Sequence, residues 1–107
     1  MKELLEKLSA IREDLLAFQA QVTDVKKLAD LVEQKPHMTR WLNYREHLWP
    51  YMNDHQKSRS LDVYDILYAA AEVTQQGGKD HLTDAVTRRV PQLLADLDDI
   101  AKKLEQG

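Results

Sequence analysis

The sequence contains no cysteine and very little glycine or proline. There are three glycines and three prolines among 107 residues. Without cysteine the chain cannot form a disulfide framework, a thiolate zinc site or a cysteine nucleophile. The one glycine pair, Gly77-Gly78, lacks the further glycines and the lysine-hydroxyl ending of a phosphate-binding loop. These shortages exclude cysteine-based chemistry and a nucleotide site of the P-loop type.

A strong charge of either sign is also missing. Lysine and arginine together number 15, and aspartate and glutamate number 18, which gives a formal net charge of −3. This mild balance excludes a strong global attraction to nucleic acid or to an anionic membrane. The N-terminal stretch MKELLEKLSAIRED has no long uncharged run, so neither a signal peptide nor a membrane-spanning helix is expected. We therefore expect a cytoplasmic protein that does not associate with membranes.

The composition that remains is typical of a folded domain. Hydrophobic residues make up 43% of the chain and charged residues 31%. These proportions are ordinary for a folded protein and differ from those of a disordered one. At this length the chain can bury one core but not a second one. Residues 1–107 are therefore expected to form a single domain.

Apolar residues recur along the first third of the chain at alternating spacings of four and three. This stripe comprises Leu4, Leu8, Ile11, Leu15, Phe18, Val22, Val25, Ala29 and Val32. It keeps a heptad pattern for about four repeats with no glycine or proline inside it. The pattern predicts one amphipathic helix over residues 2–34, roughly 50 Å long at 1.5 Å per residue. Pro36 disfavours helical geometry at Lys35 and predicts the end of this helix.

Two arrangements are open for so long a helix. It can pack within a bundle formed by its own chain, or it can pair with a second copy. Because the remaining elements look too short to cover its whole length, we favour an intertwined or coiled-coil-like homodimer. The residues predicted to form the dimer interface are Leu8, Ile11, Leu15, Phe18, Val22 and Val25.

The middle of the chain predicts two helices separated by a loop. The first spans residues 39–49, from a Thr39 N-cap to the residue before Pro50. Residues 53–60 have no apolar side chain and are predicted to form an exposed loop. The second helix spans residues 61–76 and ends at the glycine pair. Since it is apolar on most of its circumference, we expect it to be the buried central helix.

A last helix is predicted over residues 81–105. Pro91 lies inside it, but the apolar register continues across the proline, which favours a kink near residue 91 over a break. No strand-like alternation occurs anywhere in the sequence. The predicted fold class is all-α, a small helical bundle built on the long N-terminal helix.

The titratable residues do not form a recognisable reaction or metal site. Three of the four histidines are His37, His47 and His55, but none is three or four residues from a suitable second ligand on one helical face. The pair Asp62 and Asp65 is explained by the positive end of the helix dipole. We therefore expect no metal, no cofactor and no catalytic residue, and we predict that the protein is not an enzyme.

One short stretch resembles a known enzyme family. Residues 6–21, EKLSAIREDLLAFQAQ, resemble the first helix of the helical chorismate mutases, which are intertwined all-α dimers. In that family an arginine precedes this stretch and another follows it, and both bind the substrate carboxylates. The corresponding positions here hold Leu5 and Val22, and the rest of the chain does not match. The family's activity is therefore not assigned.

Aromatic residues are scarce outside one stretch. Residues 39–56, TRWLNYREHLWPYMNDHQ, hold four of them within eleven positions, namely Trp41, Tyr44, Trp49 and Tyr51. At helical spacing the two tryptophans share a face with Leu42, Arg45 and Leu48 and are expected to fill the core. Tyr44, which lies off that face, is expected to point outward, and neither Tyr51 nor Met52 is explained by the core.

The aromatic stretch is also locally basic. Residues 36–60 have four basic and two acidic side chains, a net charge of +2, whereas residues 61–78 have three acidic side chains and no basic one. An aromatic, arginine-containing patch has the composition of a protein-interaction hot spot. The predicted partner-binding residues are Arg40, Tyr44, Tyr51, Met52, Lys57 and Arg59.

The sequence thus predicts a non-enzymatic helical interaction module, a small regulator, adaptor or inhibitor of another protein. The patch within residues 39–59 is its expected partner surface. The alternative is a nucleic-acid-binding regulator that uses the same patch, because aromatic and basic side chains also suit stacking on single strands. Four basic residues on an acidic domain are few for that role, since several phosphate contacts normally set the affinity.

Overall fold

The computed structural model confirms the all-α fold class. It describes residues 2–76 and 79–106, so Gly77 and Gly78, predicted to end a helix, lie outside the described residues. The elements are α1 (Lys2–Ala20), α2 (Val25–Gln34), α3 (Pro36–Thr39), α4 (Trp41–Leu48), the 3-10 turn η1 (Trp49–Tyr51), α5 (Asp54–Arg59), α6 (Asp62–Gln76) and α7 (Lys79–Gln106). Strands are absent from these residues. None of the described helices is long and apolar enough to cross a membrane.

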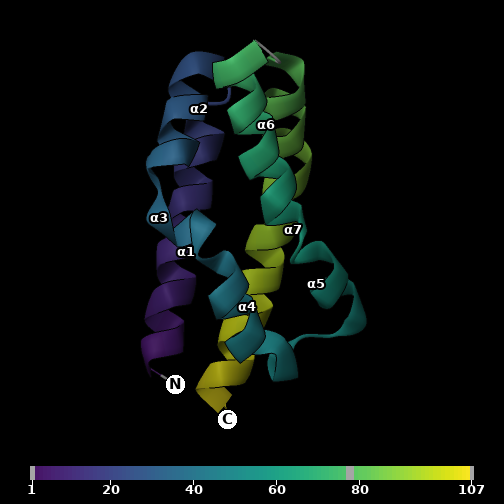
Figure 1. The fold of residues 1–107 in the computed structure, drawn as a ribbon. Coiled ribbons are helices and arrows are strands. Elements are labelled where there is room, and N and C mark those ends of the chain that lie inside the picture. Colours follow the sequence, from purple (N-terminus) through teal and green to yellow (C-terminus); the bar gives the residue numbers. More distant parts are fainter. Residues whose placement is uncertain (1, 77–78, 107) are drawn as a thin grey trace.

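The helices form four segments of a bundle, and successive segments run in opposite directions (Figure 1). The first segment is α1, and the second consists of α2, α3 and α4. The third consists of α5 and α6, and the fourth is α7. The ends marked N and C lie at the same end of the molecule. The principal dimensions are 44 × 23 × 21 Å, and the 28 residues of α7 alone cover nearly this length at 1.5 Å per residue.

The predicted single helix over residues 2–34 is wrong, because the chain turns between α1 and α2. Asp24 is the N-cap of α2, and its side chain accepts a hydrogen bond from the backbone N–H of Lys27 at 3.2 Å. The apolar stripe continues through the turn because both helices of this hairpin bury one face against the same core. The stripe therefore predicted the buried positions correctly and concealed the turn. The end of α2 at Gln34, before Pro36, is confirmed.

The face predicted to pair two copies of α1 is buried within the chain. Leu8, Ile11, Leu15 and Phe18 are between 0 and 3% exposed and belong to the core. Val22 and Val25 are partly buried and pack against that core. Helix α7 lies along α1 and covers its apolar face, which the sequence analysis expected a second copy to cover. The prediction that these six residues form a dimer interface is therefore wrong, since their apolar surface is already covered.

The chain between α2 and α6 is more broken than predicted. The helix expected over residues 39–49 is observed as α4 followed by η1, in which Pro50 lies. Thr39, the expected N-cap, is instead the last residue of a separate short helix, α3, which begins with Pro36. The expected loop over residues 53–60 contains α5. Asn53 and Gln56 close a capping box at its start: the Gln56 backbone N–H donates to Asn53 Oδ1, and the Asn53 N–H donates to Gln56 Oε1. Capping, rather than an apolar face, explains this short helix.

Helix α7, and not α6, is the central element. It contacts α1, α2, α5, α6 and η1, whereas α6 packs mainly on α2 and α7 and leaves Leu61 and Tyr68 exposed at its outer side. The helix runs through Pro91 without a break. Proline removes one backbone donor and crowds the carbonyl of Thr87, four residues before it. Both residues are exposed, so this defect faces solvent and the apolar face of α7 stays continuous.

A histidine links α6 to α7 through two carboxylates. His81 Nδ1 lies 2.7 Å from Glu72 Oε2, and His81 Nε2 lies 3.1 Å from Asp65 Oδ1. Both ring nitrogens can donate at once only in the protonated ring. The hydrogen bond with Glu72, followed by that with Asp65, raises the pKa of His81 above its usual 6.5. Arg89 of α7 also approaches Asp65, at 3.6 Å.

We expect stability to fall as this histidine loses its proton. Because the folded-state pKa of His81 is raised, its contribution is complete below the unfolded pKa of about 6.5 and is lost as the pH rises through the folded pKa. Thermal unfolding of the wild type and of His81→Gln between about pH 5.5 and 9 measures this. The stability difference between the two proteins should shrink with rising pH. A difference that stays constant over the range would contradict the assignment.

Candidate protein-interaction site

The structure separates the six predicted partner-binding residues. Arg40 is exposed at the N-cap of α4 and makes no side-chain capping bond. Lys57 is half-buried on α5, with its Nζ over the ring of Trp49. Tyr51 is half-buried and packs against the core, and its backbone carbonyl accepts a hydrogen bond from Lys103 Nζ. Of these three, Arg40 and Lys57 retain charged groups at the surface.

Two others belong to the core, where the sequence did not place them. Tyr44 is 8% exposed, with Lys7 Nζ 5.0 Å from its ring centroid, and Met52 is 7% exposed. The expectation that Tyr44 points outward is therefore wrong. Trp41 is buried as predicted, and its Nε1 donates to the backbone carbonyl of Ser60. The buried face of α4 comprises Trp41, Tyr44 and Leu48, at spacings of three and four.

Because α4 buries the face formed by Trp41, Tyr44 and Leu48, Trp49 lies toward solvent. The prediction that Trp49 fills the core is wrong, because 41% of its surface is exposed. Arg45 Cζ lies 4.6 Å and Lys57 Nζ 5.0 Å from the centroid of its ring, which is the geometry of two cation–π contacts. Leu42, one helical turn before Arg45, is 47% exposed. These four residues, Leu42, Arg45, Trp49 and Lys57, are called the Trp49 surface below.

Arg45 is held beside Trp49 by a hydrogen bond to a neighbouring element. Its Nε donates to Ser60 Oγ, and Ser60 Oγ donates in turn to the backbone carbonyl of Lys57. One hydroxyl at the C-terminal end of α5 thus connects the Arg45 side chain on α4 with the backbone of α5 at Lys57. This connection brings α4 and α5 together where both cations lie over the ring of Trp49.

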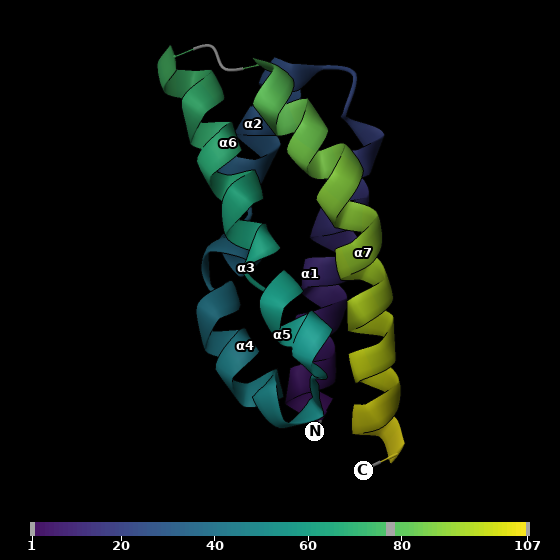
Figure 2. The ribbon, with the colours of Figure 1, turned by 90° about the vertical axis from the view of Figure 1, so that its right-hand side faces the viewer.

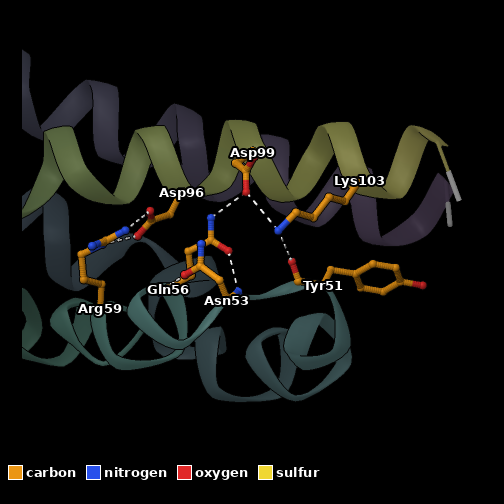
Figure 3. Close-up of polar contacts among 7 residues, drawn as sticks. All are labelled: Tyr51, Asn53, Gln56, Arg59, Asp96, Asp99 and Lys103. Carbon is orange, nitrogen blue, oxygen red and sulfur yellow. Dashed lines mark hydrogen bonds and ion pairs between the residues drawn. The ribbon is translucent and has the colours of Figure 1, made fainter.

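Helix α5 is attached to α7 by polar contacts, shown in Figure 3. Arg59 donates two hydrogen bonds to Asp96, at 2.8 and 2.7 Å. One turn further along α7, Gln56 Nε2 donates to Asp99 Oδ2 at 2.8 Å. Lys103 then contacts both Asp99 and the Tyr51 carbonyl, at 3.2 and 3.1 Å. We call this row of contacts the α5–α7 polar row.

Electrostatics agree with this geometry. The bidentate bond to Asp96 raises the pKa of Arg59 above its usual value, so this guanidinium stays charged. The hydrogen bond from Gln56, followed by that from Lys103, lowers the pKa of Asp99. Arg59 is therefore engaged inside the protein, and its charge is neutralised by Asp96. That use of Arg59 was not foreseen when the sequence placed it on the partner surface.

Other polar groups and hollows do not converge on a reaction centre. His37 Nδ1 lies 3.0 Å from Oδ2 of the buried Asp14 and links α3 to α1, and His47 and His55 are exposed. Within residues 2–76 and 79–106, no group of three histidine or carboxylate side chains could hold a metal ion. A shallow hollow of about 230 Å³ between α1 and α7 is crossed by the Arg12–Asp98 ion pair. The Trp49 surface is therefore the candidate site.

The Trp49 surface was missed because two registers fit the same short helix. The spacing of Trp41, Leu48 and Trp49 suggested one face, whereas Met38, Trp41, Tyr44 and Leu48 form the face that is buried. The spacing itself could have identified it, because Leu42, Arg45 and Trp49 are three and four residues apart, each one position after a residue of the buried face. Trp49 keeps helical backbone angles, φ −49° and ψ −45°, and so still follows this register.

Comparison of the chain with protein-family models, with curated proteins and with solved structures found no match.

The two tryptophans should differ sharply in their effect on stability. We expect Trp41→Ala to reduce the free energy of unfolding by about 3–5 kcal/mol, because it empties a core position and removes the bond to Ser60. Trp49→Ala should reduce it by about 1 kcal/mol, since mainly the cation–π contacts are lost. Urea unfolding followed by circular dichroism measures both, with Tyr44→Ala as a second core variant. Equal losses for the two tryptophans would contradict the burial described above.

The Arg59–Asp96 pair should show strong coupling. Arg59→Ala leaves a nearly buried carboxylate without its cation, and we expect a loss of about 1–3 kcal/mol, reduced from that of a buried pair because 35% of the Arg59 side chain is exposed. Adding Asp96→Ala to Arg59→Ala should cost little more. A double-mutant cycle from urea unfolding tests this, and strictly additive losses would exclude a direct interaction.

Proposed function

We propose that the protein is a non-enzymatic helical interaction module that acts as a small regulator, adaptor or inhibitor of another protein. The observation that carries this proposal is an exposed tryptophan placed between an arginine and a lysine. Tryptophan and arginine are the residues most enriched in interaction hot spots. A cytoplasmic location remains a prediction from the sequence.

The chemistry of the Trp49 surface defines the partner. Arg45 and Lys57 present positive charge beside the ring, and the exposed Leu42 adds apolar area one turn away from Arg45. A complementary segment carries an aliphatic or aromatic side chain flanked by carboxylates. Opposite charges across such a contact increase the association rate and exclude basic segments. We therefore propose an acidic, apolar segment of another protein as the ligand.

Nucleic acid remains the second candidate, because a base could stack on Trp49 while phosphates meet the cations. The structure weakens this candidate by neutralising Arg59 with Asp96. The basic side chains then left for phosphate on this part of the chain are Arg40, Arg45 and Lys57. Arg40 lies about 13 to 14 Å from Trp49 along the axis of α4. So few contacts support only weak, salt-sensitive binding.

Selection from a random peptide library tests the protein ligand. The full-length protein is the bait, and peptides that also bind Trp49→Ala are removed. We expect enrichment of peptides that combine aspartate or glutamate with leucine, phenylalanine or tryptophan. Their affinity should fall at least about tenfold for Trp49→Ala, as for a hot-spot residue.

Leu16→Ala is the matched control, because Leu16 on α1 is 40% exposed, almost the same as Trp49. It should leave peptide affinity unchanged. Peptides that bind the wild type and Trp49→Ala equally would exclude the Trp49 surface as the site. A fluorescent single-stranded oligonucleotide serves as the competing ligand. We expect binding no tighter than about micromolar at physiological salt, and submicromolar binding that requires Arg45 and Lys57 would favour the second candidate.

A further inference from the structure

Helix α6 has a second apolar stripe that the described part of the chain leaves partly exposed. Its inner face, formed by Val63, Ile66, Ala69 and Ala70, is fully buried. The opposite side carries Leu61, Tyr64, Tyr68 and Ala71 at spacings of three and four, which is the spacing of a helix-pairing seam. Tyr68 is 71% exposed and Leu61, just before α6, is 49% exposed. The helix thus has one apolar face in the core and one in solvent.

This stripe continues into the Trp49 surface. Leu61 follows Ser60, whose backbone carbonyl and hydroxyl accept the bonds from Trp41 and Arg45, so Leu61 lies where α4 and α6 meet. Figures 1 and 2 show α4 and α6 on the same side of the bundle, one toward each end. Among the described residues, four of the five exposed large hydrophobic side chains lie here, namely Leu42, Trp49, Leu61 and Tyr68. We call these four residues and their surroundings the α4–α6 edge.

The two ends of this edge carry opposite charge. On the α6 side Asp62, Asp65 and Glu72 are acidic and α6 has no basic residue, although His81 and Arg89 of α7 offset part of this charge. The side chains of Asp65 and Glu72 remain 36 and 45% exposed. On the other side Arg45 and Lys57 flank Trp49. A rotation by 180° about an axis near Leu61 and perpendicular to the long axis of the bundle exchanges these two ends.

We propose that the α4–α6 edge binds a second copy of the chain in antiparallel orientation. In this arrangement Tyr68 and the acidic end of α6 from one copy contact the Trp49 surface of the other, and the same contact occurs twice. A two-fold interface requires such self-complementarity. A parallel arrangement would instead place acidic against acidic and basic against basic ends. Charge complementarity therefore selects both the partner and its direction.

A dimer of standard size would use most of the side of the bundle on which the edge lies. One long face of the bundle, 44 by 21 Å, has an area on the order of 900 Å². A standard stable interface buries about 800 Å² on each partner. The proposal rests on the proposed function, because it names a second occupant for the Trp49 surface. Dimerisation and binding of the acidic partner then exclude each other, so that the partner binds the monomer.

Sedimentation and light scattering at rising concentration test the dimer. At tens of micromolar we expect a mass of about twice the 12.4 kDa of one chain. Tyr68→Lys should raise the dimer dissociation constant at least about tenfold, because it places a positive charge against Arg45 and Lys57 of the other copy and removes the most exposed ring of the seam. Leu16→Lys introduces the same charge at an exposed leucine on α1, outside the edge, and should leave the constant unchanged. Salt should weaken the dimer, since the paired charges are at the surface.

The outcomes separate this inference from the proposed function. A mass of one chain at all concentrations, or a dimer that Leu16→Lys weakens as much as Tyr68→Lys, overturns the inference. A dimer weakened by Tyr68→Lys but not by Trp49→Ala overturns the antiparallel arrangement. Peptide binding is measured separately, at concentrations where the chain is monomeric. There, Tyr68→Lys should retain full affinity and Trp49→Ala should lose it, whatever the outcome for the dimer.

Discussion

The continuous apolar face of α7 connects the fourth segment of the bundle to the other three. Its buried residues are Leu82, Ala85, Val86, Val90, Leu93, Leu97, Ile100 and Leu104. At one end this face packs against α6 and α2, and farther along it packs against α1. Because the proline defect at Pro91 faces solvent, the apolar register does not shift between the two ends. Helix α7 thereby connects the end of the bundle that contains α6 with the end that contains α4 and α5. If its apolar face were interrupted, only α1 would set the position of one end relative to the other.

The sequence predicted the buried positions better than the path of the chain. Periodicity identified Leu8, Leu15 and Phe18 as buried and placed α6 within one residue of its observed start. Periodicity depends only on which side of a helix is apolar, so it cannot distinguish one long helix from two that fold back on a shared core. The turn at Asp24 required attention to a single capping residue. The assumption that a second chain must cover α1 followed from that missed turn.

The candidate site was harder to predict because it depends on the packing of a short helix. α4 has only eight residues, and Tyr44 and Trp49 are both large enough to fill the core beside Trp41. Tertiary contacts decide between them: Lys7 of α1 lies over Tyr44, while Trp49 shares a helical face with Leu42 and Arg45 on the side of α4 that is exposed to solvent. Pairing between Arg59 and Asp96 is also invisible in a sequence, since the two residues are 37 positions apart. Local composition correctly indicated an aromatic, basic segment and could not assign each side chain to core or surface.

The support of the Trp49 surface is chemically different from the rest of the bundle. Helix α5 buries only Gln56 and is attached to α7 mainly by the α5–α7 polar row. Separation of α5 from α7 therefore exposes little apolar area, and both the denaturant dependence and the heat-capacity change of such a local opening are small. Urea or heat, which report the loss of apolar burial, would barely register it, whereas amide hydrogen exchange would. The chain can thus lose the position of Lys57 beside Trp49, and with it the binding surface, while its hydrophobic core stays folded.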